Sequence, residues 1–445
     1  MDGDRKGAMG RFVRNVRLLA LSAALTVLAA GCGDGLIRDG GAGPAQDRTN
    51  GEPAVTLRFW HTFSDQETVV FENEVVPLFE KDHPNIRIQA EFMPYTDQLK
   101  TTLTASVGTS DAPDLMRMDI VWVPEFAKLG ILEPVDQLDG FDDVTQSVFP
   151  ATLVTNLYKG RYYGVPMNTN TKVAIYHRAL LEKAGLKDAP ANMEQLVSAV
   201  RRLRAEGEEV YGIAAKCCSA WDILPYFWTL GGQFTSPDDG RASGYLDSPE
   251  SVAAIEKIRA WADEGIIGPS LLGESPDPWG GLEDGKYLMI DDGPWYFTLN
   301  TNFVETRIDV LKDTLPAPLP ADIGGRRSVV GGENLVLIKG SRHPEEAWAF
   351  MRFMMTEEPQ RLMAATGLIP TNSKAAASLD PANPPYLRAY LEQINQSLPR
   401  PPVPNWSRIE KVFSRYVEKI MRREMETESA LKEAAREIDA LLRED

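Results

Sequence analysis

The stretch VTLRFWHTFSDQETVVFENEVVPLFEKDHPNIRIQAEFMP, residues 55–94, decides the fold class of this chain. Apolar and polar residues alternate over residues 55–60 and again over 86–92, which is the period of a half-buried strand. Residues 65–85 between them have acidic side chains early and apolar side chains at helical spacing. Strand, helix and strand in this order predict a βαβ unit, and therefore an α/β fold with a parallel sheet covered by helices.

Later segments repeat this logic. Short apolar runs at 287–291 and 334–340 predict buried strands. Residues 248–265 and 344–358 begin with polar or acidic side chains and predict helices, and residues 428–445 carry an apolar stripe at helical spacing. Strands and helices therefore continue to alternate to the end of the chain, as an α/β fold requires.

The N-terminus has the pattern of a secretory signal. Basic residues within 5–17 precede the uncharged run LLALSAALTVLAAG at 18–31, which is too short to span a bilayer comfortably. Small residues before Cys32 resemble a bacterial lipobox, which implies lipidation of that thiol; an ordinary signal peptide with a chance cysteine is the alternative. We expect a lipoprotein signal peptide over 1–31 and a flexible, glycine-rich tether over 32–53.

Composition excludes several functions. The formal net charge is −17, and removal of residues 1–31 takes away five basic and two acidic side chains, which leaves −20. Such an acidic chain is unsuited to nucleic acid as its main partner. The four histidines are scattered without HExxH spacing, and two of the three cysteines are adjacent rather than in CxxC spacing. We therefore expect no metal, no cofactor and no nucleophilic triad.

Several further segments carry a family resemblance, and they follow one another along nearly the whole chain. They are LRFWHTFSD (57–65), APDLMRMDIVWVPEFAKLGILEPVDQL (112–138), GRYYGVPMNTNTKVAIYHRALLEKAGL (160–186), FWTLGGQF (227–234), GKYLMIDDGPWYF (285–297), GGENLVLIKGSRHPEEAWAFMRFMM (331–355) and TGLIPTNSKA (366–375). In this order they resemble the extracellular solute-binding proteins of bacterial ABC sugar importers, relatives of the maltose-binding and glycerol-phosphate-binding proteins.

The resemblance implies a two-lobed periplasmic-binding-protein fold (type II-like), with a hinge and a ligand cleft between the lobes. We place lobe one at 54–165 plus 328–368, and lobe two at 166–327 plus 369–445. The implied function is capture of a di- or oligosaccharide or a glycoside by lobe closure, and its delivery to ABC permease transmembrane subunits. The resemblance also implies a binding protein rather than an enzyme, a monomer, and a location outside the cell membrane, anchored by lipid on Cys32.

Sugar sites combine aromatic platforms with acids and amides, so the candidate ligand-binding residues are of these types. Those after the first strand lie where open α/β sheets bind ligands, and the two glycines before Glu333 would let backbone approach the ligand closely. Others are carried over from the resemblance, among them Asp119, Trp221 and Trp295. The candidates are Trp60, His61, Thr62, Asp65, Glu67, Asp119, Trp122, Asn170, Cys217, Cys218, Ser219, Trp221, Asp222, Trp295, Gly332, Glu333, Asn334 and Trp406.

The adjacent Cys217 and Cys218 admit three states. With Cys32 assigned to lipid, they are the remaining thiols, and they face an oxidising exterior. A bond between them is strained, because neighbouring Cα atoms lie about 3.8 Å apart and disulfides usually span 4.4–6.8 Å. A vicinal disulfide that shapes the binding site, two buried thiols and an intermolecular link all stay open.

Two other functions stay open as well. A glycerophosphodiester or other non-sugar anion would favour arginine in the cleft, and Arg58, Arg117, Arg161 and Arg408 are available. A secreted glycoside hydrolase would need two carboxylates about 5–9 Å apart across the scissile bond.

Overall fold

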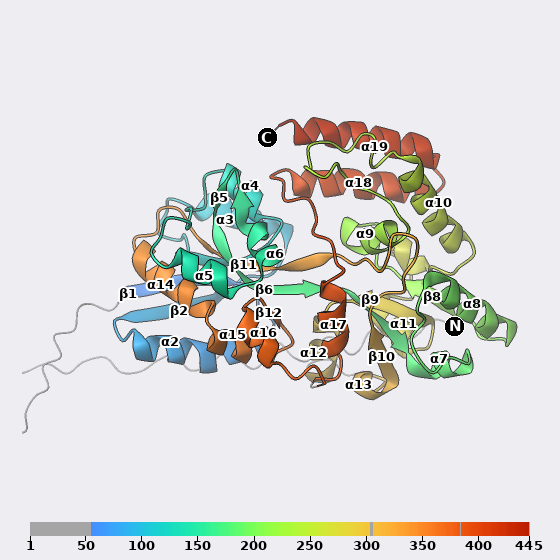
Figure 1. Ribbon diagram of the computed structural model, residues 1–445, viewed down its shortest axis with the longest axis horizontal. Coiled ribbons are helices and arrows are strands. Elements are labelled where there is room, and N and C mark those ends of the chain that lie inside the picture. The colour runs from blue at the N-terminus through green and yellow to red at the C-terminus, as the bar shows by residue number, and fades with distance from the viewer. Residues whose placement is uncertain (1–54, 303–305, 383, 445) are drawn as a thin grey trace, which may run out of the picture. The chain divides into compact units, whose positions relative to one another are not determined.

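The computed structural model describes residues 55–302, 306–382 and 384–444 (Figure 1). The expected signal peptide, tether and lipidated Cys32 lie outside these residues. Within them, the larger sheet has six strands, in the order β12 (Ile369–Pro370), β6 (Gly164–Thr171), β11 (Val330–Leu337), β3 (Leu115–Asp119), β1 (Val55–His61) and β2 (Ile86–Phe92). The predicted βαβ unit is confirmed, because β1 and β2 pair in parallel with Val55 opposite Ile86.

A second, four-stranded sheet has the order β10 (Thr314–Ala317), β7 (Val173–His177), β9 (Tyr287–Asp292) and β8 (Tyr211–Ala214). A small hairpin joins β4 (Leu157–Tyr158) to β5 (Arg161–Tyr162). The chain changes from the first sheet to the second at Lys172, between β6 and β7. The expected lobe boundaries at 166 and 369 therefore fall within strands of the first sheet rather than between the sheets.

Helices surround both sheets in Figure 1. Those of residues 65–153 and 344–378 are α1 (Asp65–Val70), α2 (Val76–Asp82), α3 (Asp97–Ser106), α4 (Val123–Lys128), α5 (Phe141–Ser147), α6 (Pro150–Leu153), α14 (Pro344–Met354), α15 (Glu357–Ala364) and α16 (Ser373–Ser378). The others are α7 (Arg178–Lys183), α8 (Met193–Ala205), α9 (Ala220–Thr229), α10 (Pro249–Asp263), α11 (Pro278–Glu283), α12 (Trp295–Asn302), α13 (Val310–Asp313), α17 (Leu387–Ile394), α18 (Trp406–Met421) and α19 (Thr427–Leu442). Within the described ranges, no helix combines the length and the apolar character needed to cross a membrane.

Among the described residues, three apolar clusters hold these layers together. One lies between the six-stranded sheet and its helices and includes Phe59, Phe71 and Phe350, whose rings are 5.3 to 6.3 Å apart by centroid. Another includes the apolar faces of α18 and α19, which pack on each other and on α10. The helix predicted over 428–445 is thus confirmed, and its apolar stripe is the face that it buries in the core.

Three passages of the chain run side by side where the sheets meet, and they form the hinge segment. They are residues 171–172, 328–330 and 397–398. Val330 N donates to Leu398 O at 2.9 Å, and Leu398 N donates to Ser328 O at 2.8 Å. Residues 171–172 and 328–330 each connect a strand of one sheet to a strand of the other, and residues 397–398, between α17 and α18, are hydrogen-bonded to the second of these passages. Relative movement of the sheets therefore has to bend the chain at this segment.

Candidate functional site

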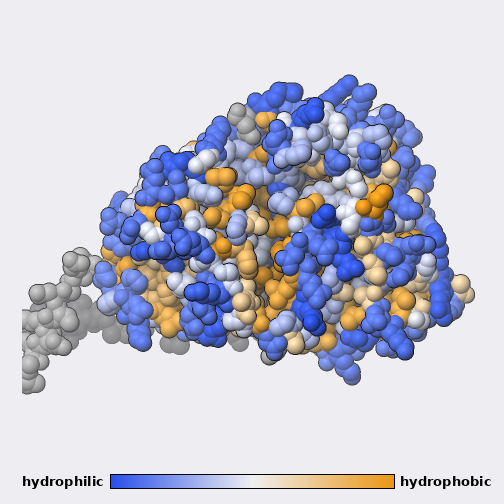
Figure 2. Space-filling model, viewed as in Figure 1, coloured by the Kyte–Doolittle hydropathy of each residue, from blue (hydrophilic) through white to orange (hydrophobic). Residues whose placement is uncertain are grey.

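A cleft of about 620 Å³ lies between elements of the two sheets. Its walls come from the ends of β1, β3 and β11 on one side and from α9, α12 and α18 on the other. Figure 2 shows apolar side chains gathered along the middle of the molecule, between more hydrophilic parts to either side. A volume of this size is ordinary for a small-molecule site.

The first wall is built around a buried arginine. Arg117 on β3 donates to Thr62 Oγ1 at 2.7 Å, to Glu333 Oε2 at 2.7 Å and to Asn168 Oδ1 at 3.3 Å. Asn168 Nδ2 also donates to Glu333 Oε2, at 2.6 Å. Burial raises the pKa of Glu333, and the Arg117 guanidinium opposes that rise. One carboxylate oxygen of Glu333 is thus held by two donors, which fixes the direction in which the other points.

A second polar group lies on the same wall at Asp119. Tyr95 Oη donates to Asp119 Oδ2 at 2.8 Å, and Val121 N donates to Oδ1 at 2.9 Å. Arg400 approaches Asp119 Oδ1 at 3.8 Å from the opposite side of the cleft. Asp119 is therefore oriented by its own lobe and faces a cation from the other.

Aromatic rings form the opposite wall. Trp221, in the first turn of α9, and Trp295, at the start of α12, lie with ring centroids 6.2 Å apart and planes 32° apart. The guanidinium of Arg400 lies 5.1 Å from the Trp221 ring centroid. Gly293 precedes Trp295, and a Cβ there would come within 2.2 Å of the indole, so this turn requires a glycine.

Three buried polar atoms of cleft-lining residues have no hydrogen-bond partner among the described residues. They are Oδ1 of Asn170, a side chain that is 6% exposed, Nε of Arg117, which is 4% exposed, and Nε of Arg400, which is 8% exposed. Buried polar atoms are nearly always paired, so these three atoms are candidates for contact with a ligand.

The glycine pair before Glu333 brings backbone close to this cleft. Gly332 has a φ of +135°, and a Cβ there would lie 2.4 Å from Asn168 O. A Cβ on Gly331 would lie 2.2 Å from Asn170 Oδ1. Both positions therefore require glycine, because the neighbouring strand β6 lies so close to them. Close approach of this backbone to a ligand stays a prediction.

The structure divides the predicted site residues into three groups. Eight line the cleft: Thr62, Glu67, Asp119, Asn170, Trp221, Trp295, Gly332 and Glu333. Four line an adjoining groove of about 630 Å³, which shares Tyr95, Arg400 and Glu410 with the cleft: Trp122, Cys217, Cys218 and Ser219. The other six line neither: Trp60, His61, Asp65, Asp222, Asn334 and Trp406.

Strand alternation explains two of these six. Asn334 follows Glu333 on β11 and so points away from the cleft, where it accepts from Thr155 Oγ1 and Asn156 Nδ2, both at 3.1 Å. His61 is 1% exposed among phenylalanine rings, the nearest being Phe63 at 4.9 Å between centroids. Both are interior side chains rather than cleft residues.

The remaining four have structural surroundings of their own. Trp406 is fully buried at the start of α18, with its ring 5.5 Å from that of Phe234. Trp60 is 5% exposed and donates to Glu91. Asp65 is an exposed residue that begins α1, and Asp222 is paired inside the protein, as described below.

Cys217 and Cys218 are two separate thiols in the structure, the second of the three states that the sequence leaves open. Cys217 Sγ donates to Asp222 Oδ2 at 3.2 Å, and Cys218 Sγ donates to Leu271 O at 3.4 Å. The two side chains thus bond in different directions, which suits unbridged neighbours better than the short span that a bridge requires. They line the adjoining groove rather than the cleft.

Sequence reasoning missed three cleft side chains that the structure brings forward. Arg117 was named only as an arginine available for phosphate, although a charge within the apolar run LMRMD is a signal for a buried partner. Arg400 and Glu410 come from the end of the chain, in a proline-rich loop and on α18, and no local pattern marks them. Burial raises the pKa of Glu410, and Arg400 opposes that rise.

Comparison with known proteins places the chain in a family. A family model described as "Bacterial extracellular solute-binding protein" matches residues 64–361, more than half of the chain. The chain belongs to this family. The expected two-lobed α/β fold is confirmed with it, because solved structures with this fold are the structural neighbours. The family is one of binding proteins.

Individual relatives agree. The chain is 26% identical over 385 residues to a putative binding protein of Brucella abortus, a match that covers 85% of this chain and 91% of the relative. It is 24% identical over 359 residues to a maltotriose-binding protein of Pyrococcus abyssi, covering 78% and 73%. A maltose-bound structure of MalE3 from T. maritima superposes with a TM-score of 0.73 at 25% identity, covering 87% of this chain and all of that one.

In the part of the chain that the structure describes, no three His, Cys, Asp or Glu side chains are arranged to hold a metal ion.

Proposed function

We propose that the cleft binds a carbohydrate, either a di- or oligosaccharide or a glycoside. The observation that carries this proposal is the pairing of two indole rings with an unpartnered acceptor, Asn170 Oδ1, and two unpartnered donors, Nε of Arg117 and Nε of Arg400. A sugar hydroxyl can donate and accept at once, and the C–H face of a sugar ring matches an aromatic surface. The sugar-binding names among the relatives, such as the maltotriose-binding protein, support the same class.

The charge of the cleft favours a neutral polyol over a phosphodiester. Four carboxylates line it, and two guanidiniums face them: Glu67, Asp119, Glu333, Glu410, Arg117 and Arg400. Arg117 is already committed to three acceptors. An anionic ligand would therefore meet a surplus of negative charge, which opposes its binding.

The position of this cleft, whose walls come from both sides of the hinge segment, supports capture by lobe closure. We further propose that the protein serves an ABC permease outside the cytoplasm, acts as a monomer, and is held at the membrane by lipid on Cys32. The N-terminal pattern of residues 1–32 supports the lipid anchor.

A thermal-shift screen of the mature protein tests the ligand class. Maltose, maltotriose, a glycerophosphodiester and a tripeptide are compared, since a ligand that binds the folded state raises the melting temperature. We expect a shift with a saccharide, which isothermal titration then confirms. Trp221→Ala should weaken that binding at least tenfold, because it removes a ring from the cleft wall.

Trp279→Ala is the matched control. Trp279 lies on α11 and donates to Asp292 at 2.6 Å, and it does not line the cleft. It should change affinity less than threefold. Binding of the phosphodiester in place of any saccharide, or equal effects of the two tryptophan substitutions, would contradict the proposed function. Reducing sugar released on long incubation would indicate a hydrolase instead.

The anchor is tested in cells. Cys32→Ala should release the protein from the membrane fraction and abolish incorporation of labelled palmitate. Unchanged membrane association would contradict lipid attachment at this residue.

A further inference from the structure

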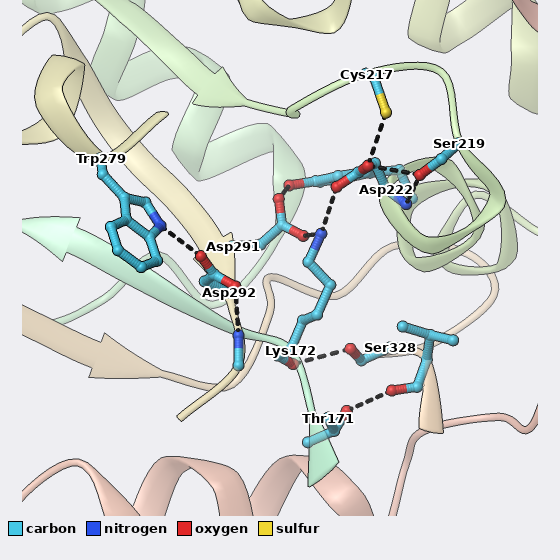
Figure 3. A network of polar contacts seen from close by, with 12 residues as sticks. Thr171, Lys172, Cys217, Ser219, Asp222, Trp279, Asp291, Asp292 and Ser328 are labelled. Carbon is cyan, nitrogen blue, oxygen red and sulfur yellow. Dashed lines mark hydrogen bonds and ion pairs between the residues drawn. The ribbon is translucent and has the colours of Figure 1, made fainter. Parts of the chain in front are cut away.

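Lys172 lies at the point where the chain passes from one sheet to the other, and it is buried to 2% exposure. Its Nζ is 2.9 Å from Asp222 Oδ1 and 2.5 Å from Asp291 Oδ2 (Figure 3). Asp291 belongs to β9 and also accepts from Tyr226 Oη at 2.6 Å. One side chain on the hinge segment thus ties a helix and a strand of the second lobe together.

The cluster keeps its positive member charged. Burial lowers the pKa of Lys172, but the neighbouring carboxylates of Asp222, Asp291 and Asp292 raise it further, so the net direction is upward. A buried ammonium with two carboxylate partners cannot leave them without a large loss of electrostatic energy. The positions of Asp222 and Asp291 relative to the Lys172 ammonium are therefore fixed.

Asp222 connects the ion pairs of Lys172 to the wall of the ligand cleft. Asp222 is adjacent to Trp221 in the first turn of α9, and Ser219 Oγ and Cys217 Sγ donate to its Oδ2 at 2.6 and 3.2 Å. Figure 3 shows these donors on the side of Asp222 away from Lys172. Lys172 Nζ itself lies 5.9 Å from the Trp221 ring centroid. Asp222 is held from two sides, and the indole follows the helix turn to which it belongs.

Lys172 and its neighbour Thr171 are also hydrogen-bonded to residues 328–330 of the hinge segment. The Lys172 carbonyl accepts from Ser328 Oγ at 2.8 Å, and the preceding Thr171 Oγ1 donates to Val329 O at 2.9 Å. Backbone contacts on one side and the ion cluster on the other make Lys172 a link between the hinge and the cleft wall.

We propose that Lys172 is a positioning residue for ligand binding, which fixes the Trp221 ring relative to the hinge by holding Asp222 and Asp291. This inference rests on the proposed function, because it takes the Trp221 ring as part of the ligand platform. A ring held before the ligand arrives has less freedom to lose on binding, and this raises affinity. A residue with a purely structural role would stabilise the second lobe and leave the affinity of the folded protein unchanged.

The test must separate the loss of Trp221 positioning from the destabilisation that unpaired buried carboxylates cause. Lys172→Met alone strands two carboxylates in the interior and risks unfolding. The working variant therefore combines Lys172→Met with Asp222→Asn and Asp291→Asn, which removes the charges together and keeps the side chains close in size. Ile438→Ala is the matched control, since Ile438 is fully buried in α19 and lines neither the cleft nor the groove.

With maltotriose as the probe, the neutral triple variant should bind about tenfold more weakly than the unsubstituted protein. The Ile438→Ala control should stay within twofold although its melting temperature falls. Affinity of the triple variant within twofold of the unsubstituted protein would overturn the inference.

Hydrogen exchange supplies a readout that needs no ligand. Amides of residues 219–224 and 171–173 should exchange about tenfold faster in the triple variant, whereas Ile438→Ala should not change these segments relative to the rest of the second lobe. Unchanged protection of 219–224 would overturn the inference. If the unsubstituted protein binds no saccharide, the proposed function fails, and the exchange result still decides whether Lys172 holds this helix turn.

Discussion

Acidification should destabilise this protein through one buried histidine. His61 is 1% exposed at the end of β1, and its Nδ1 accepts from Phe63 N at 3.3 Å. Burial and the nearby Arg117 guanidinium lower its pKa from 6.5 to about 4. The folded protein therefore keeps His61 neutral in a pH range where the unfolded chain protonates it.

The size of the effect follows from these two values. Because the folded pKa lies below the unfolded one, the stabilising contribution of neutral His61 is complete above pH 6.5 and is lost as the pH falls toward 4. At about 1.4 kcal/mol per pH unit, the full contribution is about 3 kcal/mol, and about 2 kcal/mol of it is lost by pH 5.

His61→Asn isolates this contribution. The asparagine Oδ1 can take the place of the ring Nδ1 as acceptor for the Phe63 N–H, but it does not titrate. Urea unfolding followed by tryptophan fluorescence at pH 8 and pH 5 gives the free energy of unfolding of both proteins. The unsubstituted protein should lose about 2 kcal/mol more than the variant over this interval. Equal losses would refute the reasoning, whatever the baseline stability of the variant.

Three further predictions concern particular side chains. Trp406→Ala should lower the free energy of unfolding, measured in urea, by about 3–5 kcal/mol and leave the affinity of the folded protein for its ligand unchanged. A stable variant with weakened binding would show that Trp406 contacts the ligand. Gly332→Ala should cost about 1–3 kcal/mol and weaken ligand binding, because its Cβ would meet Asn168 O; wild-type stability would contradict the φ of +135°. Alkylation of the denatured mature protein without reductant should modify both Cys217 and Cys218. In the native state Cys217 should react first, because burial raises the pKa of Cys218 to about 12. If both cysteines stay unmodified in the denatured protein, they form a vicinal disulfide.

Elements with strong periodicity could be predicted from the sequence. The helices over 249–263 and 427–442 and the strand over 287–292 lie within three residues of the predicted ranges, because each is decided by a local apolar pattern. The parallel pairing of β1 with β2 followed from the order of elements alone.

The site was predicted less completely, for a physical reason. Position near the end of a strand was enough to find Thr62, and the family resemblance supplied Asp119. Neither could say which face of the strand each neighbour occupies. The register put His61 and Asn334 in the interior. Arg400, which meets Asp119 from nearly three hundred residues further along the chain, depends on the tertiary fold and carries no local signal.

The start of helix α1 and the wall of the cleft share a side chain. Glu67 Oε2 accepts from Ser64 N at 3.0 Å, and Ser64 Oγ accepts from Glu67 N at 3.4 Å, so these residues form a reciprocal cap while Glu67 also lines the cleft. An engineer who changes Glu67 to alter ligand choice will also loosen the helix that begins there. Glutamine preserves the cap and removes the charge, so it is the replacement that separates these two consequences.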